Sequence, residues 1–281
     1  MPKPMPLNSE HFMTTETPTL DPRLPPRRFD QMSATSFVLS VAALAFYLWS
    51  LQGTQVSLSD LVDGFPQMAR LVGEMLPPSQ ARLQAVGWAL LETFQMALVG
   101  TVVGVLLSVP IAVLATPHLS PHPFVYHAAR TLIAFFRTVP DLVWALLFVV
   151  SVGLGPFAGT LALVVDKIGF CGRFFAEAME EVDRGPQEAL SAMGASRLSI
   201  IGCAVIPAAL PSFINTSLFS LEKATRSSVI LGLVGAGGIG IELKVAMDLF
   251  SYDEAATIIL AIFALVLLVE RFSAWLRNRL I

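Results

Sequence analysis

The stretch GPQEALSAMGASRLSIIGCAVIPAALP, residues 185–211, decides the fold because it is a polar island between long apolar runs. Pro186 suits the first position of a helix, where its missing N–H would have no partner in any case. Gly194 suits the position that closes a helix, and Ser196 can cap the helix that begins next. The pattern predicts a short helix whose small side chains could enter a groove on another protein.

The composition is that of a protein that crosses a membrane several times. Of the 281 residues, 54% are hydrophobic and only 14% are charged, which is too apolar for an ordinary soluble protein. The net charge of −3 argues against a nucleic-acid partner. Cys171 and Cys203 lie far apart in the sequence, and neither belongs to a CxxC or Cys/His motif. Neither a disulfide nor a metal site is therefore predicted.

The apolar runs predict an all-α polytopic fold with six transmembrane helices, since about 20 apolar residues cross ~30 Å of hydrocarbon. The predicted spans are residues 36–51, 91–115, 128–154, 155–170, 199–221 and 255–275. Pro140 breaks the third span. Residues 1–35 are predicted to form a cytoplasmic tail and residues 36–281 a transmembrane domain, with a polar loop at about 171–198.

Two local patterns add to this outline. Gly100 and Gly104 form a GxxxG pattern, which favours close packing of the second span against another helix. Between the first and second spans, apolar residues recur at helical spacing before Pro77 and Pro78, which predicts a short amphipathic helix there. The apolar residues in question are Leu61, Phe65, Met68, Leu71 and Met75.

The distribution of Lys and Arg predicts the orientation, because basic residues accumulate in cytoplasmic loops. Eleven lie on one side of the predicted spans, namely Lys3, Arg23, Arg27, Arg28, Arg130, Arg173, Arg184, Arg197, Arg271, Arg277 and Arg279. Five lie on the other side, namely Arg70, Arg82, Lys223, Arg226 and Lys244. This bias places both termini and the segment 185–211 in the cytoplasm.

Within that segment, Glu188-Ala189, Gly194 and the sequence VIP at 205–207 resemble the cytoplasmic loop of permease subunits of bacterial ABC importers. The match is incomplete, because residues 190, 204 and 206 carry small apolar exchanges relative to that family. The resemblance implies a coupling helix that docks on a separate ATPase subunit. The residues that it implies for this coupling are Glu188, Ala189, Ala192, Gly194 and Pro207.

The chain also resembles one subgroup of these proteins, the phosphonate-import permeases. The matching segments are MLPP at 75–78, ETFQMA at 92–97, PDLVWA at 140–145, GLGPFAG at 153–159, FAEA at 175–178 and LGLVGAGGIG at 231–240. This resemblance implies a homodimer in the bacterial inner membrane, two copies of an ATP-binding ABC subunit and an extracytoplasmic phosphonate-binding protein. Methionine-import permeases share the loop and the glycine-rich segment, so a permease for methionine or another small solute stays as the alternative.

The leading hypothesis is therefore a membrane-spanning permease subunit for phosphonates or related phosphorus oxyanions, such as phosphite or phosphate. The chain contains no Gly-x-x-x-x-Gly-Lys-Ser/Thr and so lacks a phosphate-cradling loop of its own. We expect a transporter subunit rather than an enzyme, with no cofactor on this chain and with ATP and Mg²⁺ on the partner ATPase. A third hypothesis, from a different class, is an intramembrane cofactor-dependent enzyme.

The glycines near residue 237 have two interpretations. Gly235, Gly237 and Gly240 fit the dinucleotide-binding pattern GxGxxG, but that site needs a soluble βαβ unit, and a membrane-length run follows here. The preferred interpretation is a tightly packed turn at membrane depth, where glycine permits non-helical backbone beside a cavity. We hypothesise that Gly235, Gly237, Gly238 and Gly240 line the translocation pathway or its gate.

Two oppositely charged pairs complete the candidate pathway, Arg137 with Asp141 and Glu222 with Arg226. Each pair is spaced i,i+4, at which opposite charges on one helix face meet, and a lone charge at the bilayer centre costs ~3 kcal/mol. Each pair has two interpretations, as a structural clamp or as pathway residues. In the second case Arg226, or else Arg137, attracts a passing anion while its carboxylate partner keeps the binding weak.

Overall fold

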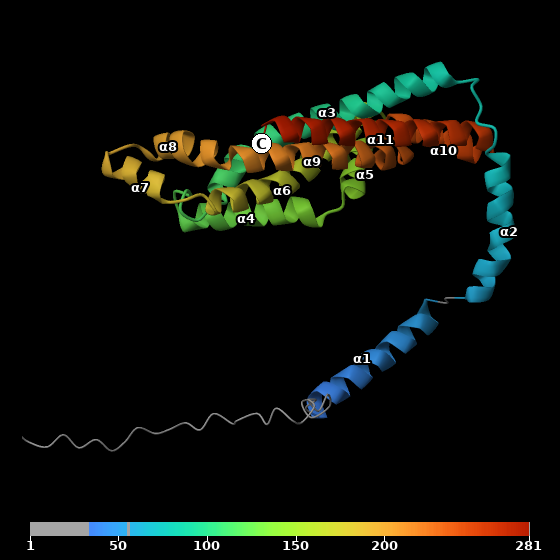
Figure 1. Ribbon diagram of the computed structural model, residues 1–281, viewed down its shortest axis with the longest axis horizontal. Coiled ribbons are helices and arrows are strands. Elements are labelled where there is room, and N and C mark those ends of the chain that lie inside the picture. Colours follow the sequence, from blue (N-terminus) through green and yellow to red (C-terminus); the bar gives the residue numbers. More distant parts are fainter. Residues whose placement is uncertain (1–33, 55–56, 281) are drawn as a thin grey trace, which may run out of the picture. The chain divides into compact units, whose positions relative to one another are not determined.

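The computed structural model describes residues 34–54 and 57–280, and this part of the chain contains helices and no strands (Figure 1). The all-α prediction is confirmed for these residues. The chain divides into two units, of which the first ends at Phe65 and the second begins at Pro66. Because residues 1–33 lie outside the described residues, the cytoplasmic tail and its boundary with the permease domain stay predictions.

The first unit contains α1 (Ala34–Gly53), which corresponds to the first predicted span. The second helix, α2 (Leu58–Glu74), crosses the boundary between the two units and has no buried residue. Its strong segregation of apolar and polar residues, and its end just before Pro77, agree with the amphipathic helix expected from the sequence.

The second unit is a helical bundle. Its elements are α3 (Leu83–Leu114), α4 (Pro123–Thr138), α5 (Asp141–Val152), α6 (Pro156–Glu180), α7 (Gly185–Ala192), α8 (Arg197–Ile200), a π-helical turn η1 (Ile201–Val205), α9 (Ile206–Leu233), α10 (Ile239–Asp248) and α11 (Tyr252–Leu280). Within this unit, α7 and α8 lie at one end of the bundle and α10 lies at the other (Figure 1). The residues predicted for coupling on α7 and the predicted gate glycines next to α10 therefore lie at opposite ends of the bundle.

Helix α6 is the centre of the bundle, since it packs against α3, α4, α5 and α9. The closest of these contacts is with α3, where glycines let the two backbones approach. A Cβ added at Gly100 would lie 2.7 Å from the Cβ of Leu163, and one added at Gly104 would collide with the Cβ of Lys167. The close packing predicted for the GxxxG pattern is confirmed, because only glycine fits these two positions.

The count of six spans is not confirmed. Four described helical segments are long and apolar enough to cross a membrane, and a fifth is reached if α4 and α5, which meet at an 88° bend, count as one broken span. The predicted span that fails this test is α6, which carries Asp166, Lys167 and Arg173 within an otherwise apolar run. The bend lies at Pro140, where the sequence predicted a break.

Two helices extend beyond the predicted spans. The fourth predicted span ends at residue 170, whereas α6 continues to Glu180, into the segment predicted as a polar loop. The fifth was expected to end at residue 221, but α9 continues to Leu233. Lys223 and Arg226 consequently lie within a helix that could span the membrane, and neither belongs to the loop in which the orientation argument counted them.

Candidate functional site

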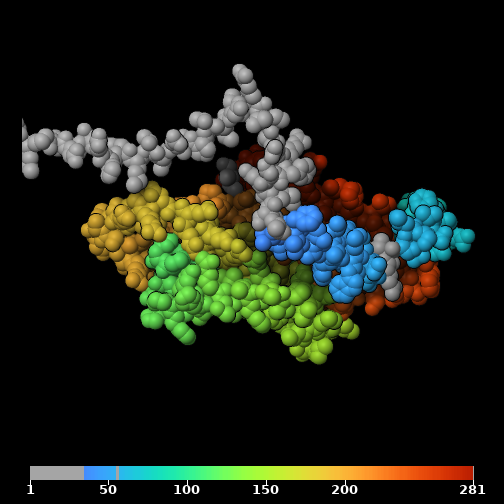
Figure 2. Space-filling view, turned by 90° about the horizontal axis from the view of Figure 1, so that it is seen from below, coloured from blue at the N-terminus to red at the C-terminus, as the bar shows by residue number. Residues whose placement is uncertain are grey.

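Helix α7 is held at the end of the bundle with its side chains uncovered. It packs against α8 and η1, none of its residues is buried, and the gold and orange region of Figure 2 shows this end of the second unit at the surface. Three of the residues predicted for coupling, Glu188, Ala189 and Ala192, are exposed on α7. The helix therefore presents a small-residue surface that another protein can reach.

Both ends of α7 follow from the sequence. Pro186 stands in its first turn, as predicted. Gly194 has φ of +80°, and the N–H of Ala195 donates to the carbonyl of Leu190 at 3.0 Å, so the chain leaves the helix through a left-handed glycine. Ser196 then caps α8 by accepting a hydrogen bond from the N–H of Ser199 at 3.3 Å.

Pro207, the fifth residue predicted for coupling, lies elsewhere. It stands in the first turn of α9, after the π-helical turn η1. The structure therefore does not bring Pro207 onto the exposed surface of α7, and its place is at the junction of η1 and α9. The coupling role of all five residues stays a prediction.

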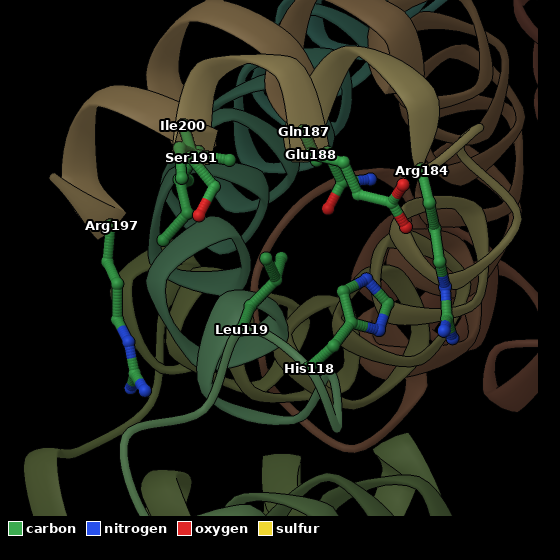
Figure 3. Close-up of a pocket in the computed structure, with 9 residues that line it drawn as sticks. His118, Leu119, Arg184, Gln187, Glu188, Ser191, Arg197 and Ile200 are labelled. Atoms are coloured by element: carbon green, nitrogen blue, oxygen red, sulfur yellow. The ribbon is translucent and has the colours of Figure 1, made fainter. Parts of the chain in front are cut away.

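A cavity of about 270 Å³ separates α7 from the turn that joins α3 to α4. Figure 3 shows Arg184 and Arg197 on opposite sides of this cavity, with His118 and Leu119 between them and Glu188 facing them from α7. The pKa of His118 lies below its ordinary value of 6.5. The larger cause is partial burial of the imidazole, and the second is the positive charge of the nearby Arg184 guanidinium. The cavity therefore favours a neutral imidazole.

The predicted gate glycines lie at the opposite end of the bundle, three of them in the turn between α9 and α10 and Gly240 in the first turn of α10 (Figure 1). Gly235, Gly237 and Gly238 all have positive φ, and a Cβ at Gly237 would lie 2.7 Å from the Cα of Pro156. Gly240 packs more closely still, because an added Cβ would collide with the carbonyl oxygen of Val229 on α9. The tightly packed turn expected from the sequence is present, and helix rather than strand precedes it, which excludes a Rossmann-type dinucleotide site here.

Two side chains of α3 hold this turn in place. Glu92 accepts a hydrogen bond of 2.8 Å from the N–H of Gly238, and Thr93 accepts one of 2.8 Å from the N–H of Ile239. These N–H groups begin α10 and have no partner within the helix, so Glu92 and Thr93 cap it from a distant part of the sequence. The motif ETFQMA contained both residues, but their capping role was not predicted.

The predicted pairing of Arg137 with Asp141 is wrong. The chain turns by 88° at Val139–Pro140, so the two residues lie on different helices and the i,i+4 geometry does not apply. The Asp141 carboxylate instead accepts a hydrogen bond of 3.0 Å from the N–H of Leu142 at the start of α5. Arg137 is exposed and lines a cavity between α4 and α6.

The predicted pairing of Glu222 with Arg226 is also wrong, although both lie on α9. Glu222 accepts a hydrogen bond of 2.9 Å from Arg277 on α11, and its side chain is only 11% exposed. Arg226 is exposed, and no carboxylate of residues 34–54 or 57–280 forms an ion pair with it. Glu222 therefore serves as a bridge between two helices, whereas Arg226 is left available.

The structure adds a charged cluster that was not predicted. Asp166 and Lys167 on α6 form an ion pair of 2.7 Å, and Lys223 on α9 reaches the same carboxylate at 3.1 Å. The sequence did contain a signal for this cluster, because two adjacent opposite charges interrupt the apolar run of α6. A charge in the bilayer is costly, and the same argument pointed to the two i,i+4 pairs. Lys223 was missed because α9 was predicted to end before it.

Comparison with known proteins places these features in a family. Residues 85–281 match the family model described as binding-protein-dependent transport system inner membrane component. The phosphite transport system permease protein PtxC of Stutzerimonas stutzeri is 38% identical over 249 residues, which cover 88% of this chain and 89% of that protein. The phosphate-import permease protein PhnE of Mycolicibacterium smegmatis is 38% identical over 77% of this chain, but only 41% of that longer protein is covered.

Among solved structures, an inward-facing form of the MetNI methionine ABC transporter matches with a TM-score of 0.62 and 25% identity, over 72% of this chain and 98% of the compared chain. The similarity to the two permeases named for phosphorus compounds is thus higher in identity than the similarity to this methionine transporter. The chain belongs to the family of binding-protein-dependent transport system inner membrane components, and it is a multi-pass membrane permease subunit.

Proposed function

We propose that this chain is the permease subunit of an ATP-driven importer for a phosphorus oxyanion, namely phosphite, phosphate or a phosphonate. The relatives named for phosphite and phosphate transport support this substrate class. Lys223 and Arg226 also support it, because they place positive charge on a helix that could span the membrane. A permease for methionine is the second candidate, supported by the likeness to the methionine transporter.

The observation that carries the coupling part of this proposal is the exposure of α7. A short helix with no buried residue, fixed at both ends by Pro186 and Gly194, is suited to a groove on a partner protein. In this proposal two copies of an ATPase subunit, which bind ATP and Mg²⁺, dock on the α7 helices of a homodimer. The chain itself contains no phosphate-cradling loop, so the energy of ATP hydrolysis comes from that partner.

The proposed orientation places α7 and both termini in the cytoplasm. The last turn of α11 carries Arg277 and Arg279, in agreement with a cytoplasmic C-terminus. The α10 end of the bundle then faces outward, where an extracytoplasmic binding protein delivers the substrate. The importer lies in the bacterial inner membrane.

The test is reconstitution of the complete importer in lipid vesicles, with its ATPase partner and its binding protein. The binding protein is loaded in turn with phosphite, inorganic phosphate, methylphosphonate and methionine, and ATP turnover is measured. We expect at least one phosphorus compound to stimulate turnover and drive uptake. Stimulation by methionine alone would replace the proposed substrate with the second candidate.

A further inference from the structure

The charged cluster on α6 and α9 contains one carboxylate and two ammonium groups. The Asp166 Oδ2 atom accepts a hydrogen bond of 2.7 Å from Lys167 Nζ, and the two oxygens of Asp166 lie 3.1 and 3.2 Å from Lys223 Nζ. Lys167 alone neutralises the carboxylate. The charge of Lys223 is therefore in excess within this cluster.

This excess charge lies far from both ends of α6. At about 1.5 Å per residue, Asp166 is roughly 15 Å along the helix axis from Pro156 and roughly 21 Å from Glu180. A charge near the centre of a bilayer costs ~3 kcal/mol on insertion scales, and such charges usually face a water-filled cavity or a partner group. A second cation at this depth is costly unless water or a further partner group solvates it.

The two lysines differ in environment. The side chain of Lys167 is completely buried, at 0% exposure, whereas that of Lys223 is 38% exposed. Besides Asp166, Lys223 contacts the face of the Phe170 ring, with 5.2 Å between Nζ and the ring centroid. A cation over an aromatic ring is held loosely compared with a buried ion pair. Lys223 is therefore the member of the cluster that another ligand can reach.

Arg226 extends the positive charge along α9. It follows Lys223 by three residues, a spacing at which side chains are neighbours on a helix surface. Asn215, Phe219, Lys223 and Arg226 recur at helical spacing along one accessible stripe of α9. Because lipid does not accommodate two cations and an amide, this stripe suits a water-filled passage.

We propose that Lys223 and Arg226 form an anion-binding site in the translocation passage, and that Asp166 is the internal competitor that keeps this site weak. The inference rests on the proposed function and deepens it, since it assigns the substrate contact within the membrane. The ligand is a tetrahedral oxyanion, whose several oxygens can accept hydrogen bonds from an ammonium and a guanidinium at once.

The competition works by exchange of hydrogen bonds. An arriving oxyanion draws the flexible Lys223 ammonium away from Asp166, which stays paired because Lys167 remains in place. When the passage opens to the other side, Lys223 returns to Asp166 and the oxyanion loses one partner. Conduction requires binding that is strong enough for entry and weak enough for release, and the shared carboxylate provides this balance.

The test measures the Kd of inorganic phosphate and of phosphite for the purified permease–ATPase complex without binding protein, together with the maximal uptake rate in vesicles. Lys223→Gln and Arg226→Gln should each raise the Kd about tenfold, the effect of losing a charge-assisted hydrogen bond. Lys223→Arg keeps the charge and should keep the Kd within about threefold of the unaltered protein. Lys244→Gln, at an exposed lysine on α10, is the matched control with unchanged Kd.

The decisive variant removes the competitor while preserving Lys223. Asp166→Asn combined with Lys167→Met exchanges a buried ion pair for neutral side chains, a change that proteins often tolerate. It should lower the Kd several-fold and slow maximal uptake, because release becomes slower. A purely structural role for the cluster would leave the Kd unchanged in this variant, and that result would overturn the inference.

The two proposals fail in different ways. If no phosphorus compound stimulates the unaltered importer, the proposed substrate class is wrong. If the unaltered importer carries phosphite or phosphate but Lys223→Gln binds phosphate normally, only the anion-binding site at Lys223 and Arg226 is wrong. Should Lys223→Gln fail to assemble, Arg226→Gln and the Asp166 and Lys167 double variant decide the question by the same Kd measurement.

Discussion

The carboxylate of Glu92 on α3 accepts a hydrogen bond of 2.8 Å from the backbone N–H of Gly238, which lies 146 positions further along the chain. The neighbouring hydroxyl of Thr93 accepts one from the N–H of Ile239. The start of α10, and with it the glycine-rich turn, is thus positioned by a helix from another part of the bundle. A movement of α3 relative to the start of α10 would have to break these bonds.

We predict that Glu92→Ala destabilises the protein by about 1–2 kcal/mol, because a helix loses its cap and an N–H loses its partner. Glu92→Gln keeps an acceptor oxygen and should cost less. Thermal unfolding of the purified complex in detergent measures both. Gln95→Ala, at an exposed residue on the same helix, is the control. Equal stability of Glu92→Ala and Gln95→Ala would show that the cap contributes nothing.

The turn itself requires glycine at position 237. Its φ is +89°, and an added Cβ would lie 2.7 Å from both the N and the Cα of Pro156, which cannot move without shifting the start of α6. Gly237→Ala should therefore destabilise the complex by about 1–3 kcal/mol and reduce uptake more than tenfold. Protein yield, unfolding temperature and vesicle uptake check this prediction.

Gly87 on α3 provides the opposite control. It is helical, and an added Cβ would meet no other atom within 4 Å. Gly87→Ala should leave uptake unchanged and stabilise the helix by up to ~1 kcal/mol, since alanine loses less conformational entropy there. If both alanine variants behaved alike, the strained geometry assigned to Gly237 would be wrong.

Docking on α7 can be tested by adding bulk to its exposed surface. Ala189→Trp should leave the fold intact, because surface substitutions usually change stability by less than about 0.5 kcal/mol. It should prevent the ATPase subunit from copurifying, since a groove shaped for a small residue does not accept an indole. Ala81→Trp, at an exposed alanine outside α7, should copurify normally. Retention of the ATPase by Ala189→Trp would exclude this surface as the contact.

The stability of the protein should depend on pH through His118, which lines the cavity beside α7. Burial and Arg184 lower the pKa of His118 in the folded protein below its usual 6.5, so the unfolded state binds the proton more readily. The stability gained from neutral His118 is therefore present above pH 6.5 and lost as the pH falls through the lowered pKa. Unfolding temperatures from pH 8 to 5 should drop more steeply for the unaltered protein than for His118→Gln. Parallel curves would contradict the assigned shift.

Features with a local cause could be predicted from the sequence. Pro186, Gly194 and Ser196 act through their own backbone geometry, so the position of α7 and its caps was foreseeable. Long apolar runs likewise fixed most spans. α6 was predicted too short because Arg173, Glu177 and Glu180 were assigned to the polar loop, whereas they continue the helix, where Arg173 forms an ion pair with Glu177 four residues further on.

The partners of charged residues could not be predicted from spacing alone. The i,i+4 rule considers one helix, but Glu222 bonds to Arg277, 55 positions away on α11. Asp166 on α6 likewise accepts a hydrogen bond from Lys223, which lies on α9. In a bundle that buries charge, the choice of partner depends on which helices are neighbours, and this is a property of the tertiary fold.

The bridge between Glu222 and Arg277 allows the structural and the pathway roles of α9 to be separated. Arg277→Ala leaves the nearly buried Glu222 without its partner and should cost about 1–3 kcal/mol of stability. Arg226→Ala removes an exposed cation and should change stability by less than about 0.5 kcal/mol while lowering phosphate uptake. Exchanging the pair, as Glu222→Arg with Arg277→Glu, should recover much of the stability lost in Arg277→Ala. If Arg226→Ala proves the more destabilising of the two single variants, the assignment of clamp and pathway residue must be reversed.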